Sequence, residues 1–288
     1  MDLERVLLQI LEQSGITFGL GDDGVALPCF KNPIYMLDLF TEGVHFKKEW
    51  FTLEQIGYKA LAVNISDAIA LCAVPKYALL GLQLPKNFSP LEIKELVLGL
   101  QKACQEFKIQ IVGGDTIVSK SLSLAITLLA SSAKPLLRQK MRLGDLLVHT
   151  GKLGESNKAL QTLLRGGKIP SHFKFYKPAL KNLAPFMQAI RPFLHAGLDI
   201  SDGLLAECNR LSQLNQLHCK LTNPHQRAFL SGEEYEMLLC LPARNKHALI
   251  QRAKKYRIKL SFVGRVVRGK SHYKAKIWHK AANYKAMS

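Results

Sequence analysis

The sequence predicts a mixed α/β (α+β) protein of two domains. Its 288 residues exceed the roughly 150 residues of one ordinary domain, and helical and strand-like hydrophobic patterns follow one another along the chain. Charge also divides it, because residues 1–144 hold 15 Lys and Arg against 14 Asp and Glu, whereas residues 145–288 hold 25 against 8. We therefore place the boundary in the polar segment that follows residue 133 and predict domains 1–137 and 138–288.

In the first domain, hydrophobic periodicity and two capping boxes, at Thr52 and Ser89, predict three helices. They cover residues 3–13, 52–70 and 89–107. Apolar runs bounded by Gly, Pro and Asn predict the strands. These strands cover residues 25–30, 34–40, 76–84, 108–112 and 122–130.

In the second domain, we predict strands over 145–150 and 237–241 and a strand-to-helix junction around Asp199. Residues 151–156 enter a helix, and residues 171–190 are expected to be helical with a break at Pro178.

The composition indicates a globular chain, with 48% hydrophobic and 22% charged residues. No apolar run approaches the roughly 18–20 residues of a membrane span, and the first residues lack a secretory signal, so we expect a cytoplasmic protein without a membrane partner. The six cysteines form no Cys-x-x-Cys pair, so neither a zinc site nor a disulfide framework is predicted. The net charge of +18 favours polyanions, although a solvated basic face explains the basic run after Glu236 more simply.

Asp67 is a carboxylate in an apolar helical segment. Between Ile56 and Pro75 the only charged residues are Lys59 and Asp67. Asn64 precedes Asp67 by three residues, which places both on one helix face and provides no cationic neighbour. An ionised carboxylate away from water is costly unless a positive charge is supplied. A bound cation would supply it; an Asp on the solvated side of an amphipathic helix is the alternative.

Five further acids share this kind of apolar or glycine-rich context. They are Asp23, Asp38, Asp115, Asp199 and Asp202. An ordinary turn or helix cap explains several of them singly, but six together favour one shared site. Asp115 belongs to Gly113-Gly-Asp-Thr116, which we expect to end a strand as phosphate and metal loops do. Clustered carboxylates without a Cys or His pair suit Mg²⁺, which also binds nucleotide phosphates.

Seven motifs in the same order resemble the thiamine-monophosphate kinase family. They are Gly21-Asp-Asp23, Glu42-Gly-Val-His-Phe46, Tyr58-Lys-Ala-Leu-Ala-Val-Asn-Ile-Ser-Asp67, Gly113-Gly-Asp-Thr116, Thr150-Gly with Gly154-Glu-Ser156, Leu198-Asp-Ile-Ser-Asp-Gly203 and Ser231-Gly-Glu-Glu-Tyr-Glu236. The resemblance spans residues 19–240. Gly-Gly-Asp-Thr is shared with a wider superfamily of synthetases, whereas the His45 motif and the last motif favour the kinase.

The resemblance implies ATP-dependent phosphorylation of thiamine monophosphate to thiamine diphosphate, by direct in-line transfer. It implies two α/β domains in a synthetase-like fold, with the first domains of a homodimer forming a β-barrel. ATP is the co-substrate, and several Mg²⁺ ions are expected to bind Asp23, Asp38, Asp67, Asp115, Asp199 and Asp202. Nucleotide contacts are implied at Gly114, Asp115, Arg138 and Ser201, and substrate contacts at His45 and Glu233. Catalysis is then expected to depend on Asp67, Asp115, Arg138 and Asp202.

The chain departs from the family pattern at three places. The family's arginine-proline segment between the helices of the second domain appears here as Tyr176-Lys-Pro178. Met36-Leu37 stands where the family has hydroxyl residues before the strand Asp. The family's C-terminal glycine-aromatic signature, which closes over the thiamine ring, has no clear counterpart in this chain, and neither Trp278 nor Tyr284 is assigned to it from the sequence. Two alternative functions stay open: another ATP-dependent synthetase of this superfamily, for a purine intermediate or hydrogenase maturation, and a nucleic-acid-binding protein using the basic tail, which lacks a recognisable module for specific nucleic-acid binding.

Overall fold

The computed structural model describes residues 3–20, 24–28, 31–275 and 278. The chain forms two compact units: Met1–Ala68 with Ala73–Ala133 (unit 1), and Ile69–Cys72 with Lys134–Ser288 (unit 2). The boundary expected after residue 137 lies near this division, and the domain ranges stay a prediction. In the described part of the chain, no helix has the length and apolar character needed to span a membrane.

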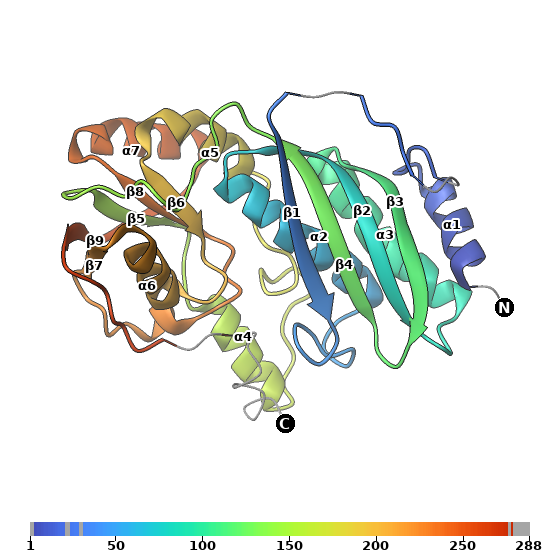
Figure 1. Ribbon diagram of the computed structural model, residues 1–288. Helices are drawn as coiled ribbons and strands as arrows, with labels where there is room; N and C mark the ends of the chain where they lie inside the picture. Colours follow the sequence, from blue (N-terminus) through green and yellow to red (C-terminus); the bar gives the residue numbers. More distant parts are fainter. Residues whose placement is uncertain (1–2, 21–23, 29–30, 276–277, 279–288) are drawn as a thin grey trace. The chain divides into compact units, whose positions relative to one another are not determined.

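Unit 1 is a four-stranded sheet with helices on one face (Figure 1). Its elements are α1 (Leu3–Ser14), β1 (Pro33–Thr41), α2 (Leu53–Ala70), β2 (Val74–Pro85), α3 (Pro90–Phe107), β3 (Gln110–Ser119) and β4 (Ser123–Ser131). The strand order is β1-β4-β2-β3; β2 and β3 are parallel, and the other two pairs are antiparallel.

Both predicted capping boxes are formed. The Thr52 hydroxyl accepts from the Gln55 backbone N–H at 3.1 Å while Gln55 Oε1 accepts from the Thr52 N–H at 3.0 Å, and Ser89 and Glu92 make the same exchange. Helices α2 and α3 approach closely at Gly99, where a Cβ atom would lie only 1.9 Å from the Glu54 carbonyl oxygen; glycine permits this approach. These local signals fix the start of α2, the helix that carries Asp67.

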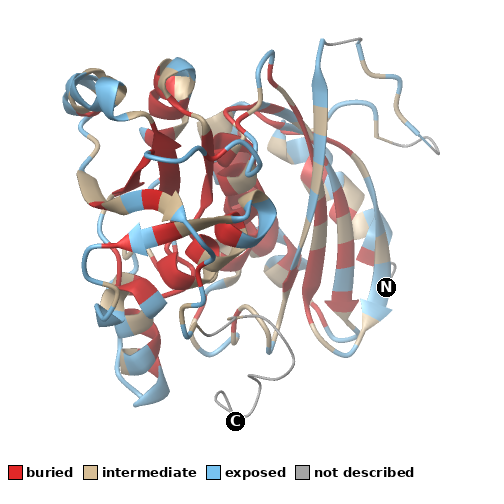
Figure 2. Cartoon of the chain, turned by 60° about the vertical axis from the view of Figure 1, so that its left-hand side comes forward, coloured by how far each residue is buried: buried red, intermediate tan, exposed pale blue. Residues whose placement is uncertain are grey.

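One face of the unit 1 sheet is open. Along β1 the exposed residues Tyr35, Leu37 and Leu39 are 66%, 61% and 57% exposed, and they alternate with more buried residues. Figure 2 shows this alternation of exposed and buried positions along the strands of unit 1. On the other face, Phe40 is buried and its ring lies 6.0 Å from the Lys59 ammonium of α2.

Unit 2 is a five-stranded antiparallel sheet in the order β6-β8-β5-β9-β7. Its elements are β5 (Leu146–Thr150), α4 (Glu155–Leu164), α5 (Leu183–Ile190), η1 (Arg191–Phe193), β6 (Ala196–Asp199), α6 (Leu204–Asn215), β7 (Leu217–Leu221), η2 (Arg227–Leu230), β8 (Met237–Leu241), η3 (Ala243–Asn245), α7 (Lys246–Tyr256) and β9 (Leu260–Arg268). Figure 1 shows α6 on one face of the sheet, and α5 with α7 on the other. A buried apolar core including Leu198, Leu211 and Val266 joins α6 to the sheet.

The mixed α/β class is therefore confirmed, and three local predictions are wrong. Residues 25–28 form no strand, and residues 29–30 lie outside the described residues. Gly113–Thr116 does not end a strand, because β3 continues to Ser119. Of residues 171–190, only 183–190 form a helix, since residues 171–182 make turns around Pro178.

The error at Gly113 has a clear cause. The register between β2 and β3 shifts where Ala78 pairs with Ile111 but Leu79 pairs with Gly113, so Val112 is the extra residue of a bulge. A Cβ on Gly114 would lie 1.9 Å from the Leu80 carbonyl oxygen. Here glycine permits close approach of the neighbouring strand instead of a turn.

Candidate active site

The predicted site residues are divided between the two units. Asp38, His45, Asp67, Gly114 and Asp115 belong to unit 1. Arg138, Asp199, Ser201, Asp202 and Glu233 belong to unit 2. Asp23 lies outside the described residues. Among the residues that the structure describes, no group of three or more His, Cys, Asp or Glu side chains is close enough to hold a metal ion. The shared metal site therefore stays a prediction.

Asp67 lies in α2, half-buried, between the fully buried Ser66 and Ala68. Asn64, one turn earlier, is 1% exposed. Lys59 is fully buried, and its ammonium lies 5.2 Å from the Phe51 ring centroid, at the N-terminal end of α2. Cation–π attraction to Phe51 and Phe40 holds that charge among aromatic rings.

The sheet register places Asp38 and Asp115 on opposite faces. Asp38 pairs with the buried Ile126. Asp115 lies in the row of paired residues Asp115, Gly81, Ala125 and Leu39, which crosses the sheet from β3 to β1 and ends at the exposed Leu39. Because paired residues share a face, Asp38 lies on the face that α2 covers and Asp115 on the open face. The exposed Asp115 carboxylate accepts a hydrogen bond from the Thr116 N–H at 2.8 Å.

His45 lies in a tight turn after β1. Its Nδ1 accepts a hydrogen bond from the Thr41 backbone N–H at 3.0 Å, and its ring centroid lies 5.5 Å from that of Phe40. An Nδ1 atom that accepts has no proton, so the neutral ring carries its proton on Nε2.

Asp199 and Asp202 flank the junction of β6 and α6, as predicted, but the structure adds two partners. Arg210 donates to Asp202 Oδ2 at 3.0 Å and to Glu207 Oε2 at 2.5 Å. Glu207 is fully buried, and burial raises its pKa to about 7, although Arg210 acts in the opposite direction. The sequence analysis missed both residues; their spacing of three on a helix that follows Asp202 was the available signal.

The Glu234 side chain links the segment Ser231-Gly-Glu-Glu-Tyr-Glu236 to the start of α4. Its Oε1 accepts from the N–H groups of Gly154 and Ser156, at 2.9 and 3.1 Å, and from the Ser231 hydroxyl at 2.6 Å. Lys174 lies 2.5 Å from Glu234 Oε2. The carboxylate thus satisfies the first N–H groups of α4 and fixes the segment that precedes β8.

The same segment brings a predicted nucleotide contact beside a predicted substrate contact. The Glu233 N–H donates to the Ser201 carbonyl oxygen at 2.7 Å, and the Glu233 carbonyl accepts from the Ser156 hydroxyl at 2.8 Å. Glu233 has a left-handed φ of 52° and is 4% exposed. The backbone hydrogen bond therefore places Glu233 next to Ser201.

Trp278, near the C-terminal end of the chain, packs on the segment that contains Gly232. Its indole N–H donates to the Leu230 carbonyl at 3.1 Å, and its backbone N–H donates to Asp202 Oδ1 at 3.1 Å. A Cβ on Gly232 would lie 2.5 Å from the indole ring, so the ring covers this glycine. Tyr284, the alternative aromatic, lies outside the described residues.

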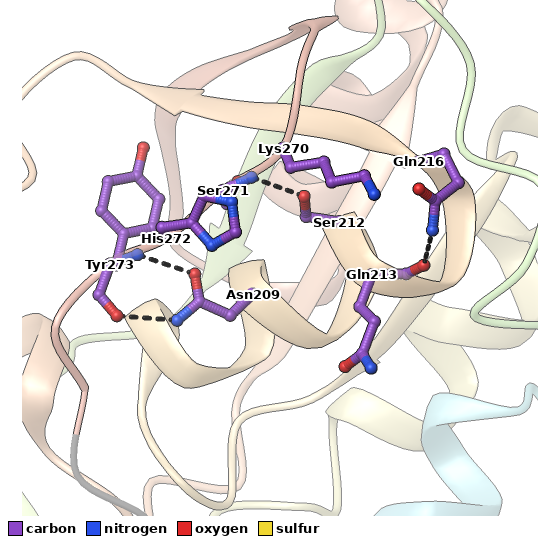
Figure 3. Close-up of a pocket in the computed structure, with 8 residues that line it drawn as sticks. All are labelled: Asn209, Ser212, Gln213, Gln216, Lys270, Ser271, His272 and Tyr273. Atoms are coloured by element: carbon purple, nitrogen blue, oxygen red, sulfur yellow. Dashed lines mark hydrogen bonds between the residues drawn. The ribbon is translucent and has the colours of Figure 1, made fainter.

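Arg138 is exposed; its carbonyl accepts from the Asn215 side chain at 2.8 Å. A cavity of about 470 Å³ lies in unit 2, between the C-terminal half of α6 and residues 270–273 (Figure 3). None of the predicted site residues lines it. Asn209 bonds the Tyr273 backbone, and Ser212 bonds that of Ser271, so several polar groups of its wall pair with one another.

Comparison with known proteins shows which family the chain resembles. Residues 21–131 match the family "AIR synthase related protein, N-terminal domain". A thiamine-monophosphate kinase of Buchnera aphidicola subsp. Schizaphis graminum is 31% identical over 85% of this chain and 83% of its own length. That of Aquifex aeolicus is 28% identical over 82% and 85%.

Solved structures of this kind share the fold. The thiamine-monophosphate kinase of Stenotrophomonas maltophilia K279a has a TM-score of 0.77 at 26% identity, covering 96% of both chains. AaThiL complexed with AMPPCP and TMP has a TM-score of 0.76 at 25% identity, covering 96% of this chain and 98% of that one. Together with the 31% identical relative, these similarities show that the chain belongs to the thiamine-monophosphate kinase family.

Proposed function

We propose that this chain transfers the γ-phosphate of ATP directly to thiamine monophosphate, forming thiamine diphosphate. Family membership supports the reaction, and one structural observation carries the assignment of the site. The hydrogen bond between the Glu233 N–H and the Ser201 carbonyl sets the expected substrate contact beside the expected nucleotide contact. Two substrates bound to adjacent backbone segments are held close together, which is the main requirement of phosphoryl transfer.

The carboxylates fit Mg²⁺ as the metal. The donor set consists of Asp oxygens without a thiolate, which is the set that hard cations prefer. Asn64 Oδ1 is a buried oxygen beside Asp67 with no hydrogen-bond partner among the described residues, as expected near an absent polar ligand. The ligands that we propose for several Mg²⁺ ions are Asp23, Asp38, Asp67, Asp115, Asp199 and Asp202. Asp38 and Asp115 lie on opposite faces and at opposite edges of one sheet, so one protomer cannot supply both to a single ion. Bound Mg²⁺ would supply positive charge that offsets the repulsion between the two anionic substrates.

The side chains then act by binding and orientation. His45 and Glu233 contact the thiamine monophosphate substrate, and Arg138 adds positive charge at the nucleotide. No general base is required, because a phosphate monoester oxygen is largely ionised near pH 7. Trp278, which covers Gly232 next to Glu233, is the aromatic side chain that we assign to the thiamine ring.

We also propose a homodimer formed through the open face of the unit 1 sheet. Tyr35, Leu37, Leu39 and Leu79 expose large apolar side chains on this face, which a monomer rarely leaves in contact with water. Pairing two such sheets would bury these side chains and form the β-barrel expected from the family. Asp115 lies on the same face, so the dimer would bring it to or beside the interface.

The test is direct product formation. Purified protein with Mg²⁺, ATP and thiamine monophosphate is expected to release thiamine diphosphate and ADP, both measured chromatographically. Glu233→Gln should raise KM for thiamine monophosphate roughly 10- to 100-fold, because a charge-assisted hydrogen bond is lost. Glu49→Gln, which removes a carboxylate that is 66% exposed and paired with Lys47, is the matched control and should leave KM unchanged. Absence of thiamine diphosphate, with ATP turnover on another acceptor, would refute the proposal.

A further inference from the structure

Asn64 has a buried side-chain amide whose NH₂ group is hydrogen-bonded, whereas its oxygen has no partner among the described residues. It is 1% exposed, and its Nδ2 donates to the Ala60 carbonyl at 3.2 Å. Its Oδ1 is also buried and accepts no hydrogen bond from the part of the chain that the structure describes. The orientation of the amide is fixed by chemistry, because only the NH₂ group can donate to the Ala60 carbonyl.

An unpaired buried amide oxygen is costly, and nothing in the local helix requires it. The bond to Ala60 reaches a carbonyl one turn back, which the helix backbone already uses. A leucine would fill a similar volume in this apolar helix without leaving a polar atom unpaired. The Asn64 oxygen therefore indicates a hydrogen-bond donor that is not among the described residues of the chain.

The position of Asn64 on α2 indicates where this donor comes from. Asp67 follows three residues later, so the two side chains lie on neighbouring parts of one helix face, about 4.5 Å apart along the axis. Asp67 is half-buried and is a ligand in the proposed metal site. Mg²⁺ in proteins keeps several of its water molecules, and each of these is a strong hydrogen-bond donor.

We propose that Asn64 Oδ1 accepts a hydrogen bond from a water molecule on the metal ion that Asp67 binds. Asn64 is thus a positioning residue that orients the hydrated ion. This inference rests on the metal site of the proposed function, and it adds a residue that is not itself a metal ligand.

The experiment measures metal binding without substrate. Mn²⁺, a spectroscopic substitute for Mg²⁺, is titrated into the purified full-length chain and followed by electron paramagnetic resonance. Asn64→Leu and Asn64→Ala should weaken Mn²⁺ binding roughly 10- to 100-fold, as loss of a hydrogen bond to a metal-bound group does. Asn64→Asp keeps an oxygen acceptor and should bind Mn²⁺ at least as tightly as the wild type.

Stability measurements separate this role from a merely structural one. The metal-free Asn64→Leu variant should melt at or above the wild-type temperature, because an unpaired buried oxygen has been removed. Its gain in melting temperature on adding Mg²⁺ should be smaller than that of the wild type. Ile65→Val, a core change at the next position, is the matched control; it should lower the melting temperature and leave Mn²⁺ affinity unchanged.

Two results would overturn the inference, and they are distinguishable. Wild-type affinity for Mn²⁺ in Asn64→Leu and Asn64→Ala would refute the role of Asn64 while leaving the metal site intact. A wild-type chain that binds no Mn²⁺ would refute the metal site of the proposed function, and the role of Asn64 with it.

Discussion

Lys174→Met tests the ionic contact that fixes the segment around Glu233. Lys174 lies 2.5 Å from Glu234 and 3.7 Å from Glu236, and its side chain is 13% exposed while that of Glu234 is fully buried. Removing one partner of a buried ion pair leaves a buried charge without compensation. We expect Lys174→Met to lower the free energy of unfolding of unit 2 by about 3 kcal/mol or more.

The assay can observe unit 2 alone. The chain has two tryptophans, of which Trp50 belongs to unit 1 and Trp278 packs on Gly232 in unit 2. In a Trp50→Phe background, urea unfolding followed by the remaining indole fluorescence reports the surroundings of Gly232. Lys174→Met should move this transition to lower urea concentration and raise KM for thiamine monophosphate, because Glu233 loses its fixed position.

Two further variants make the test of Lys174 decisive. Lys152→Met removes a lysine that is 71% exposed and paired at 3.1 Å with Glu155, and it should cost less than about 1 kcal/mol. Adding Glu234→Gln to Lys174→Met should recover stability, because the uncompensated charge disappears while an amide oxygen still accepts from α4. Equal small losses for Lys174→Met and Lys152→Met, or no recovery in the double variant, would contradict this reasoning.

Three other predictions concern the metal site, pH and the dimer. Asp67→Ala should abolish thiamine diphosphate formation without lowering the melting temperature of the metal-free protein; an unfolded variant would instead assign Asp67 a structural role. Burial raises the pKa of Glu236 above its ordinary value of 4.5, so the folded state favours its protonated form and loses stability as pH rises through that pKa. Glu236→Gln should therefore gain melting temperature relative to the wild type as pH rises above 4.5, and a difference that does not change with pH would refute this. Leu37→Glu should convert the dimer to monomer in sedimentation experiments, whereas Leu91→Glu, on α3 and 76% exposed, should not; equal masses for both variants would count against the proposed interface.

Local sequence signals predicted most of the helices and strands correctly. The capping boxes at Thr52 and Ser89 define helix starts because their side chains satisfy backbone N–H groups within one turn. The prediction at Gly113 failed because its outcome depended on a neighbouring strand. Gly113 and Gly114 are typical of a turn, but β2 pairs along the whole segment and a bulge at Val112 accommodates it.

Some residues of the candidate site could be identified from the sequence, and others could not. Asp202 and Glu233 could be selected from the sequence because acids in such motifs are specific to the family. Lys174 could not, since nothing in the sequence shows that it reaches Glu234, and for Arg210 the only signal was its spacing of three from Glu207. An exposed lysine and a lysine that pairs with a buried carboxylate look the same in a sequence, and only the packing of the folded chain distinguishes them.

The sequence by itself determined which residue types are available for phosphate and metal chemistry, and that Asp67 lies in an apolar helix beside Asn64. Both follow from composition and helical spacing, which are local properties. The tertiary structure decided that Asp38 and Asp115 lie on opposite faces of one sheet, because strand register sets the face of every side chain. It also decided that the Asn64 oxygen is buried without a partner among the described residues, because burial and pairing depend on elements distant in the sequence.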